Sequence, residues 1–385
     1  MSENPSCPSV IQGAVEKRPY QIRIVNKAIQ MFQGTFRNGA GTLEPASRSV
    51  LVESPTGSGK TTMGLLIARN LQLQTGARVG WVAMRRNLLQ QVEAENIRHG
   101  IGCDFKTISM FEKNPPTDID LLVTDEAQHD SASSCAHLHN VIQPRWILGL
   151  TATPFRSDHI KLCFDRVIRD VGIHQLIQDG YLAQYDHYTV PRWEVSQLAE
   201  FYCSDPVRWG KSIFFFRSLS ECYALKQLLQ GRGISVDVVS GSSDRDQQLE
   251  SFRRGSIQVL ANCMVLTEGF DDPTLQTVWV RPSVKGPTIQ MAGRVLRRSP
   301  DVPVKQIVQC QETSHPLPKI AMCRQQFLWQ AQEWRSLTVN PHLNLCNSNV
   351  HRAIAVTEVE LPKFLTRHQG VRRRGARPRR AGTTV

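Results

Sequence analysis

The residues whose chemistry is clearest lie in a short loop rich in glycine. An apolar run at residues 49–53 leads directly into the sequence SPTGSGKT, and a helical pattern follows. Gly57 and Gly59 let the backbone fold around a phosphate, so that successive N–H groups point inward at a helix N-terminus. Lys60 can reach phosphate oxygens, and the hydroxyl of Thr61 can ligate Mg²⁺. The alternative is a glycine-rich turn that carries a lysine by chance, and it fits this strand, loop and helix setting less well.

The loop has the form of a Walker A element, with Ser54 at the position where the general pattern has glycine. Serine is small enough to leave the turn open. We therefore expect ATP as a cofactor. The residues expected to contact it from this loop are Thr56, Gly57, Ser58, Gly59, Lys60, Thr61 and Thr62.

Two adjacent carboxylates end a second apolar run. The sequence LLVT is followed by DEAQ at residues 125–128. At the end of a strand, Asp125 can hold Mg²⁺ through water, and Glu126 can orient or deprotonate an attacking water. Alone, this sequence would more often be an acidic loop, but with the glycine-rich loop it has the form of a Walker B element. We expect Thr61 and Asp125 to hold Mg²⁺, and Lys60, Asp125 and Glu126 to be catalytic.

The composition is that of a folded, soluble protein. The chain has 385 residues, of which 41% are hydrophobic and 21% charged, and this length suggests two or three domains. No run approaches the ~18 consecutive apolar residues of a membrane helix, so we expect no membrane partner and a cytoplasmic location, or a nuclear one in a eukaryote. The closest pair among ten cysteines is Cys310 and Cys323, which gives neither a CxxC zinc motif nor a disulfide framework.

Positive charge is concentrated at the end of the chain. The net charge is +12, and residues 361–385 contribute +8 without an acidic residue. Such a composition cannot supply a hydrophobic core, so we expect a disordered basic tail. The tail fits a polyanionic partner, and a localisation signal or a protein-binding arm is the alternative interpretation.

Short β-branched and aromatic runs alternate with helical patterns in two sets. The first set is residues 49–53, 79–84, 120–125 and 145–153, and the second is 211–216, 234–240, 257–263 and 275–282. Strands that alternate with helices imply parallel sheets, so we expect an α/β fold with two tandem domains. The expected boundaries are 1–188 for the first domain, 189–308 for the second, 309–360 for a small C-terminal extension and 361–385 for the tail.

Further motifs follow one another in a familiar order. They are RPYQ at residues 18–21, GLTATP at 149–154, SIFFFRS at 212–218, TEGFDDP at 267–273 and QMAGRVLR at 290–297. With the two Walker elements they resemble the superfamily 2 helicases of the DEAD/DEAH-box type, and most of all the repair, restriction and phage-type branch. The resemblance covers roughly residues 17–300. It implies two RecA-like domains and a nucleic-acid-dependent ATPase that acts as a helicase or translocase, with DNA favoured over RNA.

The resemblance also assigns roles to individual residues. Tyr20 and Gln21 would recognise adenine, and Asp271 would belong to the nucleotide site. Gln290, Arg294 and Arg297 would be catalytic, and the two arginines would supply charge to the γ phosphate. The residues implied to contact nucleic-acid phosphates are Arg85, Arg86, Ser240, Gly241 and Thr267. A solvated basic turn is the alternative for the two arginines, and a turn-forming role is the alternative for the other three residues.

The two arginines also have a mechanical rationale of their own. Arg294 and Arg297 are three positions apart, which would place both on one helix face. On such a face they could reach a phosphate together and supply charge when two domains close. The alternative is an exposed basic helix end.

Several positions depart from the family pattern or leave alternatives open. Gln128 stands where many relatives have histidine, and its amide can still hydrogen-bond toward neighbouring motifs. Ser109 stands where many relatives have glutamine. The stretch between residues 154 and 212 has little room for an inserted domain, so a remodeller or clamp without processive unwinding remains an alternative. An RNA helicase and a non-enzymatic binding protein also remain alternatives. Protein partners are unknown.

Two other clusters were weighed as sites. The aromatic residues Phe327, Trp329 and Trp334 could stack on bases, but a hydrophobic cluster that closes the second domain is the favoured interpretation. Cys310, His315 and Cys323 have spacing too irregular to predict a zinc site.

Overall fold

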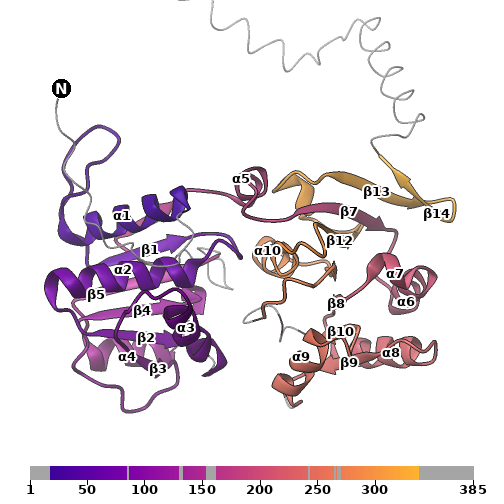
Figure 1. The fold of residues 1–385 in the computed structure, drawn as a ribbon, viewed down its shortest axis with the longest axis horizontal. Helices are drawn as coiled ribbons and strands as arrows, with labels where there is room; N and C mark the ends of the chain where they lie inside the picture. Colours follow the sequence, from indigo (N-terminus) through magenta and orange to yellow (C-terminus); the bar gives the residue numbers. More distant parts are fainter. Residues whose placement is uncertain are drawn as a thin grey trace, which may run out of the picture. The chain divides into compact units, whose positions relative to one another are not determined.

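Two β-sheets organise the chain (Figure 1). The structure, a computed structural model, describes residues 18–84, 86–129, 133–152, 162–241, 243–263, 266 and 270–337. The chain divides into the units Met1–Trp334 and Arg335–Val385. The first unit contains both sheets except for the last residues of one strand. The basic tail expected at residues 361–385 lies outside the described residues.

The first sheet has the strand order β3-β2-β4-β5-β1-β6, and its strands pair in parallel. The strands are β1 (Ser49–Glu53), β2 (Val79–Ala83), β3 (Phe105–Ser109), β4 (Leu121–Asp125), β5 (Trp146–Thr151) and β6 (Arg166–Arg169). The four central strands are those predicted, because strands covered on both faces are nearly continuous apolar runs. The edge strands β3 and β6 were not predicted, since their side chains are partly exposed and polar.

Helices accompany this sheet along the chain. They are α1 (Pro19–Gln33), α2 (Lys60–Thr75), α3 (Arg86–Arg98), the 3₁₀ helix η1 (Ala127–His129), α4 (Ser133–Ile142) and α5 (Ile173–Gln178). Helix α2 begins at Lys60, directly after Gly59. It ends at Gly76, whose φ of 70° lets its N–H donate to the carbonyl of Gln72. The predicted order of strand, glycine-rich loop and helix is therefore confirmed.

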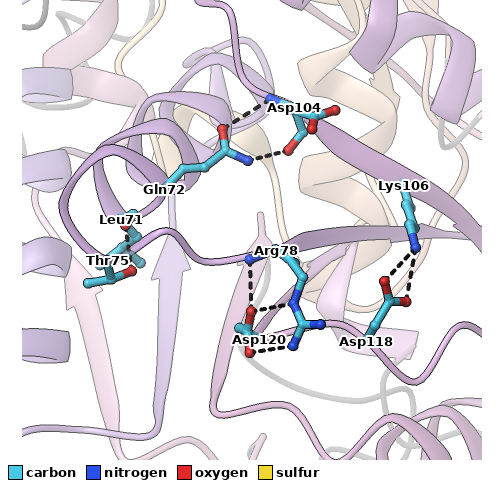
Figure 2. Close-up of polar contacts among 8 residues, drawn as sticks. All are labelled: Leu71, Gln72, Thr75, Arg78, Asp104, Lys106, Asp118 and Asp120. Atoms are coloured by element: carbon cyan, nitrogen blue, oxygen red, sulfur yellow. Dashed lines mark hydrogen bonds and ion pairs between the residues drawn. The ribbon is translucent and has the colours of Figure 1, made fainter.

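The amino ends of the strands are held by hydrogen bonds and ion pairs (Figure 2). Arg78, before β2, donates two hydrogen bonds of 2.9 Å and one of 3.1 Å to the carboxylate of Asp120, before β4. Lys106 in β3 pairs with Asp118 at 2.8 Å. The guanidinium of Arg78 lowers the pKa of Asp120. These contacts tie β2 to β4, and β3 to the segment before β4, at the edge opposite to the Walker loop.

The second sheet has eight strands in the order β14-β13-β7-β12-β11-β8-β10-β9. They are β7 (Gln184–Val190), β8 (Ser212–Phe215), β9 (Val236–Val239), β10 (Val259–Asn262), β11 (Thr277–Trp279), β12 (Val304–Cys310), β13 (Gln325–Gln330) and β14 (Glu333–Ser336). Strands β8 to β11 match the predicted second set. The expected boundary between residues 188 and 189 falls inside β7, which pairs along its length with β12.

The last two strands correct the expectation that both sheets are parallel. Strands β13 and β14 are joined by Ala331 and Gln332 alone, with φ of 52° and 63°. A two-residue connection can join only antiparallel strands, so the second sheet is mixed. Both strands fall in the stretch 309–360, where a separate extension was expected, and they belong instead to the second sheet.

Aromatic side chains cover one side of this sheet. Tyr188 stacks on Phe327 with ring centroids 4.7 Å apart, and Trp334 meets Tyr188 and Trp209 at 5.1 and 5.6 Å. Trp329 packs on Phe201 at 4.8 Å. These residues form the hydrophobic cluster that the sequence favoured over base stacking. The accompanying helices are α6 (Val195–Ser204), α7 (Pro206–Trp209), α8 (Leu219–Gln230), α9 (Arg245–Arg253), α10 (Lys285–Gly293) and the 3₁₀ helix η3 (Leu317–Lys319).

Within the described residues, none of the helices has the length and apolar character needed to cross a bilayer. The same part of the chain contains no group of three or more His, Cys, Asp or Glu side chains that could hold a metal ion.

A buried histidine should make the unfolding free energy depend on pH. His187 in β7 is 4% exposed, and its Nε2 lies 3.0 Å from Oε1 of Gln309. Burial lowers the pKa of His187 to about 4. Between pH ~6.5 and ~4 the unfolded chain binds a proton that the folded chain does not, so stability is complete above ~6.5 and falls as the pH falls.

Because of His187, the free energy of unfolding should fall by up to about 3 kcal/mol as the pH is lowered across that window. Urea unfolding at a series of pH values measures it. The variant His187→Gln should flatten the pH dependence, whereas His137→Gln, at an exposed position, should keep the wild-type slope. Equal slopes for His187→Gln and the wild type would contradict the assignment.

Candidate nucleotide and nucleic-acid site

The Walker loop depends on glycine at two positions. Gly57 and Gly59 have φ of 89° and 80°, a backbone conformation that other residues rarely adopt. A Cβ at Gly59 would lie 2.5 Å from Nε2 of Gln21, and one at Gly57 would collide with the guanidinium of Arg297. The Ser54 hydroxyl donates to Oγ of Ser58 at 2.8 Å, so serine stabilises the turn at the position where the pattern has glycine.

Tyr20 and Gln21 reach the same loop from the start of α1. The Tyr20 hydroxyl and the Gln21 amide both donate to the carbonyl oxygen of Ser58, at 2.7 and 2.8 Å. Both side chains are buried, and burial raises the pKa of Tyr20. The ring of Tyr181 lies 5.2 Å from that of Tyr20 and 5.3 Å below the guanidinium of Arg18. The motif at residues 18–21 therefore positions the loop backbone, a role that the sequence did not predict.

Lys60 is the charged centre of the site. Burial lowers the pKa of its ammonium group, the carboxylates of Glu126 and Asp125 raise it, and Arg294 and Arg297 lower it. The structure thus brings together five of the six predicted catalytic side chains within electrostatic reach. A compact group of three cations and two anions can accommodate further negative charge, which fits a triphosphate.

The chemistry of the loop and of α2 also fits the expected cofactors. The N-terminus of α2 has no side-chain cap, so its first N–H groups can bind phosphate oxygens. Thr61 and Thr62 lie in this first turn, and Asp125, 8% exposed, ends β4. A hydroxyl and a carboxylate are the hard oxygen ligands that Mg²⁺ prefers. Thr56, in the loop, lies next to Gly293, where an added Cβ would be 3.0 Å from the Cβ of Thr56.

Gln128 links Glu126 to the end of β5. Its Nε2 donates to Oε2 of Glu126 at 3.1 Å, and its Oε1 accepts a hydrogen bond from the Thr151 hydroxyl at 2.7 Å. A carboxylate can only accept, so the amide has one workable orientation. Glu126 has φ of 51°, and its N–H donates to Asp125 Oδ1 at 3.0 Å, which stabilises this unusual backbone. The expected hydrogen bond from Gln128 toward the GLTATP motif is confirmed.

The arginines of the QMAGRVLR motif reach the site by another route than predicted. Helix α10 ends at Gly293, so Arg294 is its C-cap and Arg297 lies beyond it. The expectation that both share one helix face is wrong, because glycine is a weak helix former and the following backbone is held elsewhere, with Leu296 O accepting from Ala183 N at 2.9 Å. Both arginines nevertheless act on Lys60.

Other contacts hold these arginines in place. Arg294 is 6% exposed and donates from Nη1 to the carbonyl of Phe270 at 3.0 Å. Arg297 donates from Nε to Asp271 at 2.8 Å. Asp271 therefore orients an arginine that lies beside the Walker loop. Gln290 in α10 is 9% exposed, in the helix that leads to Arg294.

The predicted nucleic-acid contacts are less well defined. Two of them, Arg85 and Thr267, lie outside the described residues. The backbone of Arg86 is described, because α3 begins there, but its side chain is not. The N–H of Ser240 donates to Oγ of Ser243 at 3.0 Å, which is the turn-forming role that the sequence left open. Gly241 has open space around it.

Comparison with known proteins places these features in a family. Residues 14–114 match the family described as Type III restriction enzyme, res subunit, and residues 194–299 match the Helicase conserved C-terminal domain. A 51.5 kDa protein of Lactococcus phage (isolate 7-9) is 28% identical over 60% of this chain and 59% of its own length. The helicase IRC3 of Saccharomyces cerevisiae is 23% identical over 49% of this chain and 34% of its own length.

Another relative is helicase 22 of Sulfolobus islandicus filamentous virus, 23% identical over 65% of this chain and 58% of its own length. The chain thus spans about one third to three fifths of the length of these relatives. Among solved structures, Saccharomyces cerevisiae Dbp5 bound to RNA and ADP BeF3 gives a TM-score of 0.52 at 15% identity, covering 76% of this chain and 87% of that one. A Dbp5 variant with the same ligands gives 0.54 at 16% identity, covering 79% and 89%. This likeness confirms the fold of two tandem RecA-like domains.

The fold and the site define a P-loop nucleotide-binding protein of the helicase class, built from two RecA-like domains. The two family matches and the phage and viral relatives support a superfamily 2 helicase of the restriction and phage type.

ATP turnover should depend on the hydrogen bond that the amide of Gln128 donates to Glu126. Gln128→Glu replaces the N–H donor by a second carboxylate, which repels Glu126 and leaves it without that hydrogen bond. We expect ATP turnover to fall about tenfold or more, because hydrogen bonds to charged groups contribute roughly 1.5–3 kcal/mol. Steady-state ATPase assays with nucleic acid measure this effect.

Gln128→His retains a donor and should keep more of the activity than Gln128→Glu. Gln90→Glu makes the same charge change at an exposed position in α3 and should leave turnover at the wild-type rate. Full turnover in Gln128→Glu would show that the contact has no part in hydrolysis.

Proposed function

We propose that the chain is an ATP-dependent nucleic-acid helicase or translocase that hydrolyses ATP between its two RecA-like domains. One observation carries this proposal: Arg297, from the second domain, lies against Gly57 of the Walker loop, and both Arg294 and Arg297 act on Lys60. Two arginines from one domain beside the phosphate loop of the other suit a site completed only when the domains close.

Each residue then has a distinct role. Lys60 and the N–H groups at the start of α2 bind phosphates, and Tyr20 and Gln21 hold the loop beside the adenine position. Mg²⁺, held by Thr61 and Asp125, would neutralise charge on the phosphate oxygens. Glu126 orients the attacking water or takes its proton, and Gln128 connects Glu126 with Thr151.

The second domain completes the site with four residues, which are Asp271, Gln290, Arg294 and Arg297. Asp271 holds Arg297, the carbonyl of Phe270 holds Arg294, and Gln290 lies in α10, the helix that leads to Arg294. A charged group fixed by its neighbours costs no reorganisation when negative charge develops on the transferred phosphoryl group. The proposed contacts to the nucleic-acid strand are Arg85, Arg86, Ser240, Gly241 and Thr267.

DNA is the proposed substrate in preference to RNA, and the basis is the match to the restriction and phage type. A remodeller or clamp without processive unwinding is the second candidate. The observation that favours it is local: residues 162–209 are occupied by β6, α5, β7, α6 and α7, so this described stretch contains no inserted domain. ATPase assays with single-stranded DNA, duplex DNA, single-stranded RNA and no nucleic acid separate the substrates. Strand-displacement and triplex-displacement assays separate unwinding from translocation.

Lys60→Ala and Glu126→Gln should fail in different ways. Lys60 binds phosphate, so its loss should weaken ATP binding and lower turnover. Glu126 acts on the water, so Glu126→Gln should bind ATP like the wild type but hydrolyse it about 10² to 10⁴ times more slowly. ATP titration by fluorescence and steady-state ATPase assays provide the two measurements.

Lys106→Ala is a matched control, because Lys106 lies in β3 at the opposite edge and pairs with an exposed aspartate. It should match the wild type in both measurements. A Glu126→Gln variant with wild-type turnover would refute the role of Glu126.

A further inference from the structure

A fully buried lysine lies in the interior of the second sheet. Lys305 in β12 is 0% exposed, and its Nζ donates to the carbonyl oxygens of Pro273 and Leu275 at 2.6 and 2.7 Å. Burial lowers the pKa of Lys305 to about 8, although the carboxylate of Asp272 raises it. The ammonium group is therefore charged at pH 7, and its hydrogen bonds to the two carbonyls are charge-assisted.

The burial of this charge is explained by the backbone that it contacts. An ammonium group that leaves water loses much of its solvation free energy, and an apolar side chain of similar size would avoid that loss. An apolar side chain would, however, leave both carbonyls without this donor. Lys305 therefore serves the backbone between Pro273 and Leu275 more than the packing of the sheet.

A second lysine contacts the same stretch of backbone, which we call segment 271–275. Strand β11 lies between β8 and β12 in the sheet, and Lys211 directly precedes β8. Lys211 Nζ donates to Oγ1 of Thr274 at 2.7 Å and to Oδ2 of Asp272 at 3.3 Å. Asp272 is 3% exposed, and its Oδ1 accepts from the N–H and the hydroxyl of Thr274 at 2.9 and 2.7 Å. The two neighbours of β11 thus each bring a lysine to the segment that leads into it.

Segment 271–275 begins with the aspartate that holds an arginine of the nucleotide site. Asp271 Oδ1 accepts from Nε of Arg297 at 2.8 Å. Arg297 lies against the Walker loop, where a Cβ at Gly57 would collide with its guanidinium. The side chain of Asp271 is 54% exposed, so packing around that side chain does not fix it. The position of Asp271 therefore depends on the backbone that follows it.

We propose that Lys305 is a positioning residue for ATP hydrolysis, because it fixes segment 271–275 and thereby the aspartate that orients Arg297. This inference rests on the proposed function and adds to it a residue beyond the last motif of the site, which ends at Arg297. The two carbonyls that Lys305 holds belong to the second and the fourth residue after Asp271. An arginine held in place before the reaction needs no reorganisation when charge develops on the transferred phosphoryl group.

Lys305→Met in the full chain tests this proposal, because methionine is an unbranched side chain without an N–H donor. ATPase assays use saturating oligodeoxythymidine or oligouridine, whichever stimulates the wild type more. The kcat should fall about tenfold, because two hydrogen bonds from a charged group are lost. The KM for ATP should stay within about twofold of the wild type, since Arg297 acts on charge that develops during the reaction.

A double-mutant cycle separates positioning from a loss of stability. Asp271→Ala breaks the link between segment 271–275 and Arg297. In this background, Lys305→Met should lower kcat by less than about twofold, because the route from Lys305 to the arginine is already interrupted. A purely structural role would lower kcat by the same factor in both backgrounds. Urea unfolding checks that each variant is folded under the conditions of the assay.

Three further variants make the test specific. Lys226→Met removes a lysine that pairs with Asp237 at 2.8 Å elsewhere in the same domain, and it should keep the wild-type kcat. Lys211→Met removes the other lysine of the segment and should also lower kcat without raising KM. Lys305→Gln keeps N–H donors without the charge, so its kcat should lie between those of Lys305→Met and the wild type. This last variant takes the place of Lys305→Met if the latter fails to fold.

The outcomes distinguish the inference from the proposed function. If the wild type hydrolyses ATP and the Lys305 variants have the same kcat, Lys305 does not position the site. If the KM for ATP rises while kcat stays constant, or if kcat falls equally in the Asp271→Ala background, the inference is overturned and the proposed function stands. If neither oligonucleotide stimulates ATP hydrolysis by the wild type, the proposed function fails as well.

Discussion

The site depends first on the backbone of one short loop, which can fold only because Gly57 and Gly59 lack side chains. Their positive φ angles turn the chain from β1 into α2, and their missing Cβ atoms leave room for Arg297 and Gln21. The carbonyl of Ser58, between them, is fixed by Tyr20 and Gln21. Elements from the start of the chain and from the second domain are thus both placed by reference to this loop.

A second set of contacts surrounds the loop and places charged groups around Lys60. Lys60 is held between the carboxylates at the end of β4 and the arginines after α10, and burial strengthens each of these interactions. The amide of Gln128 then connects Glu126 to Thr151 at the end of β5. These groups lie at the ends of the neighbouring buried strands β4 and β5, so the two hydrogen bonds of Gln128 connect one carboxyl end to the next.

The parts of the fold that the sequence predicted share a physical property. Strands β1, β2, β4 and β5 are covered on both faces, so they are apolar runs, and the Walker loop has a fixed spacing imposed by backbone geometry. The start of helix α8 also has a local cause, the capping box of Ser218 and Glu221.

The parts that were missed are set by contacts distant in the sequence. The β13–β14 hairpin turns at Ala331 and Gln332, neither of which is a usual residue for positive φ, so the sequence carries no local turn signal. The end of α10 at Gly293 depends on hydrogen bonds from Ala183 and to Phe270. The spacing of the motif correctly predicted that Arg294 and Arg297 come close to the Walker loop, but it wrongly placed both on one helix face.

Within the part of the chain that the structure describes, the two sheets end in the edge strands β3, β6, β14 and β9, and each of these strands carries a charge. Lys106 lies in β3, Arg166 and Arg169 in β6, Asp237 in β9, and Glu333 and Arg335 in β14. An unpaired strand edge is a template for another chain, and burying a charge at such a junction opposes that pairing. Charged side chains on these edge strands therefore oppose edge-to-edge pairing with another chain.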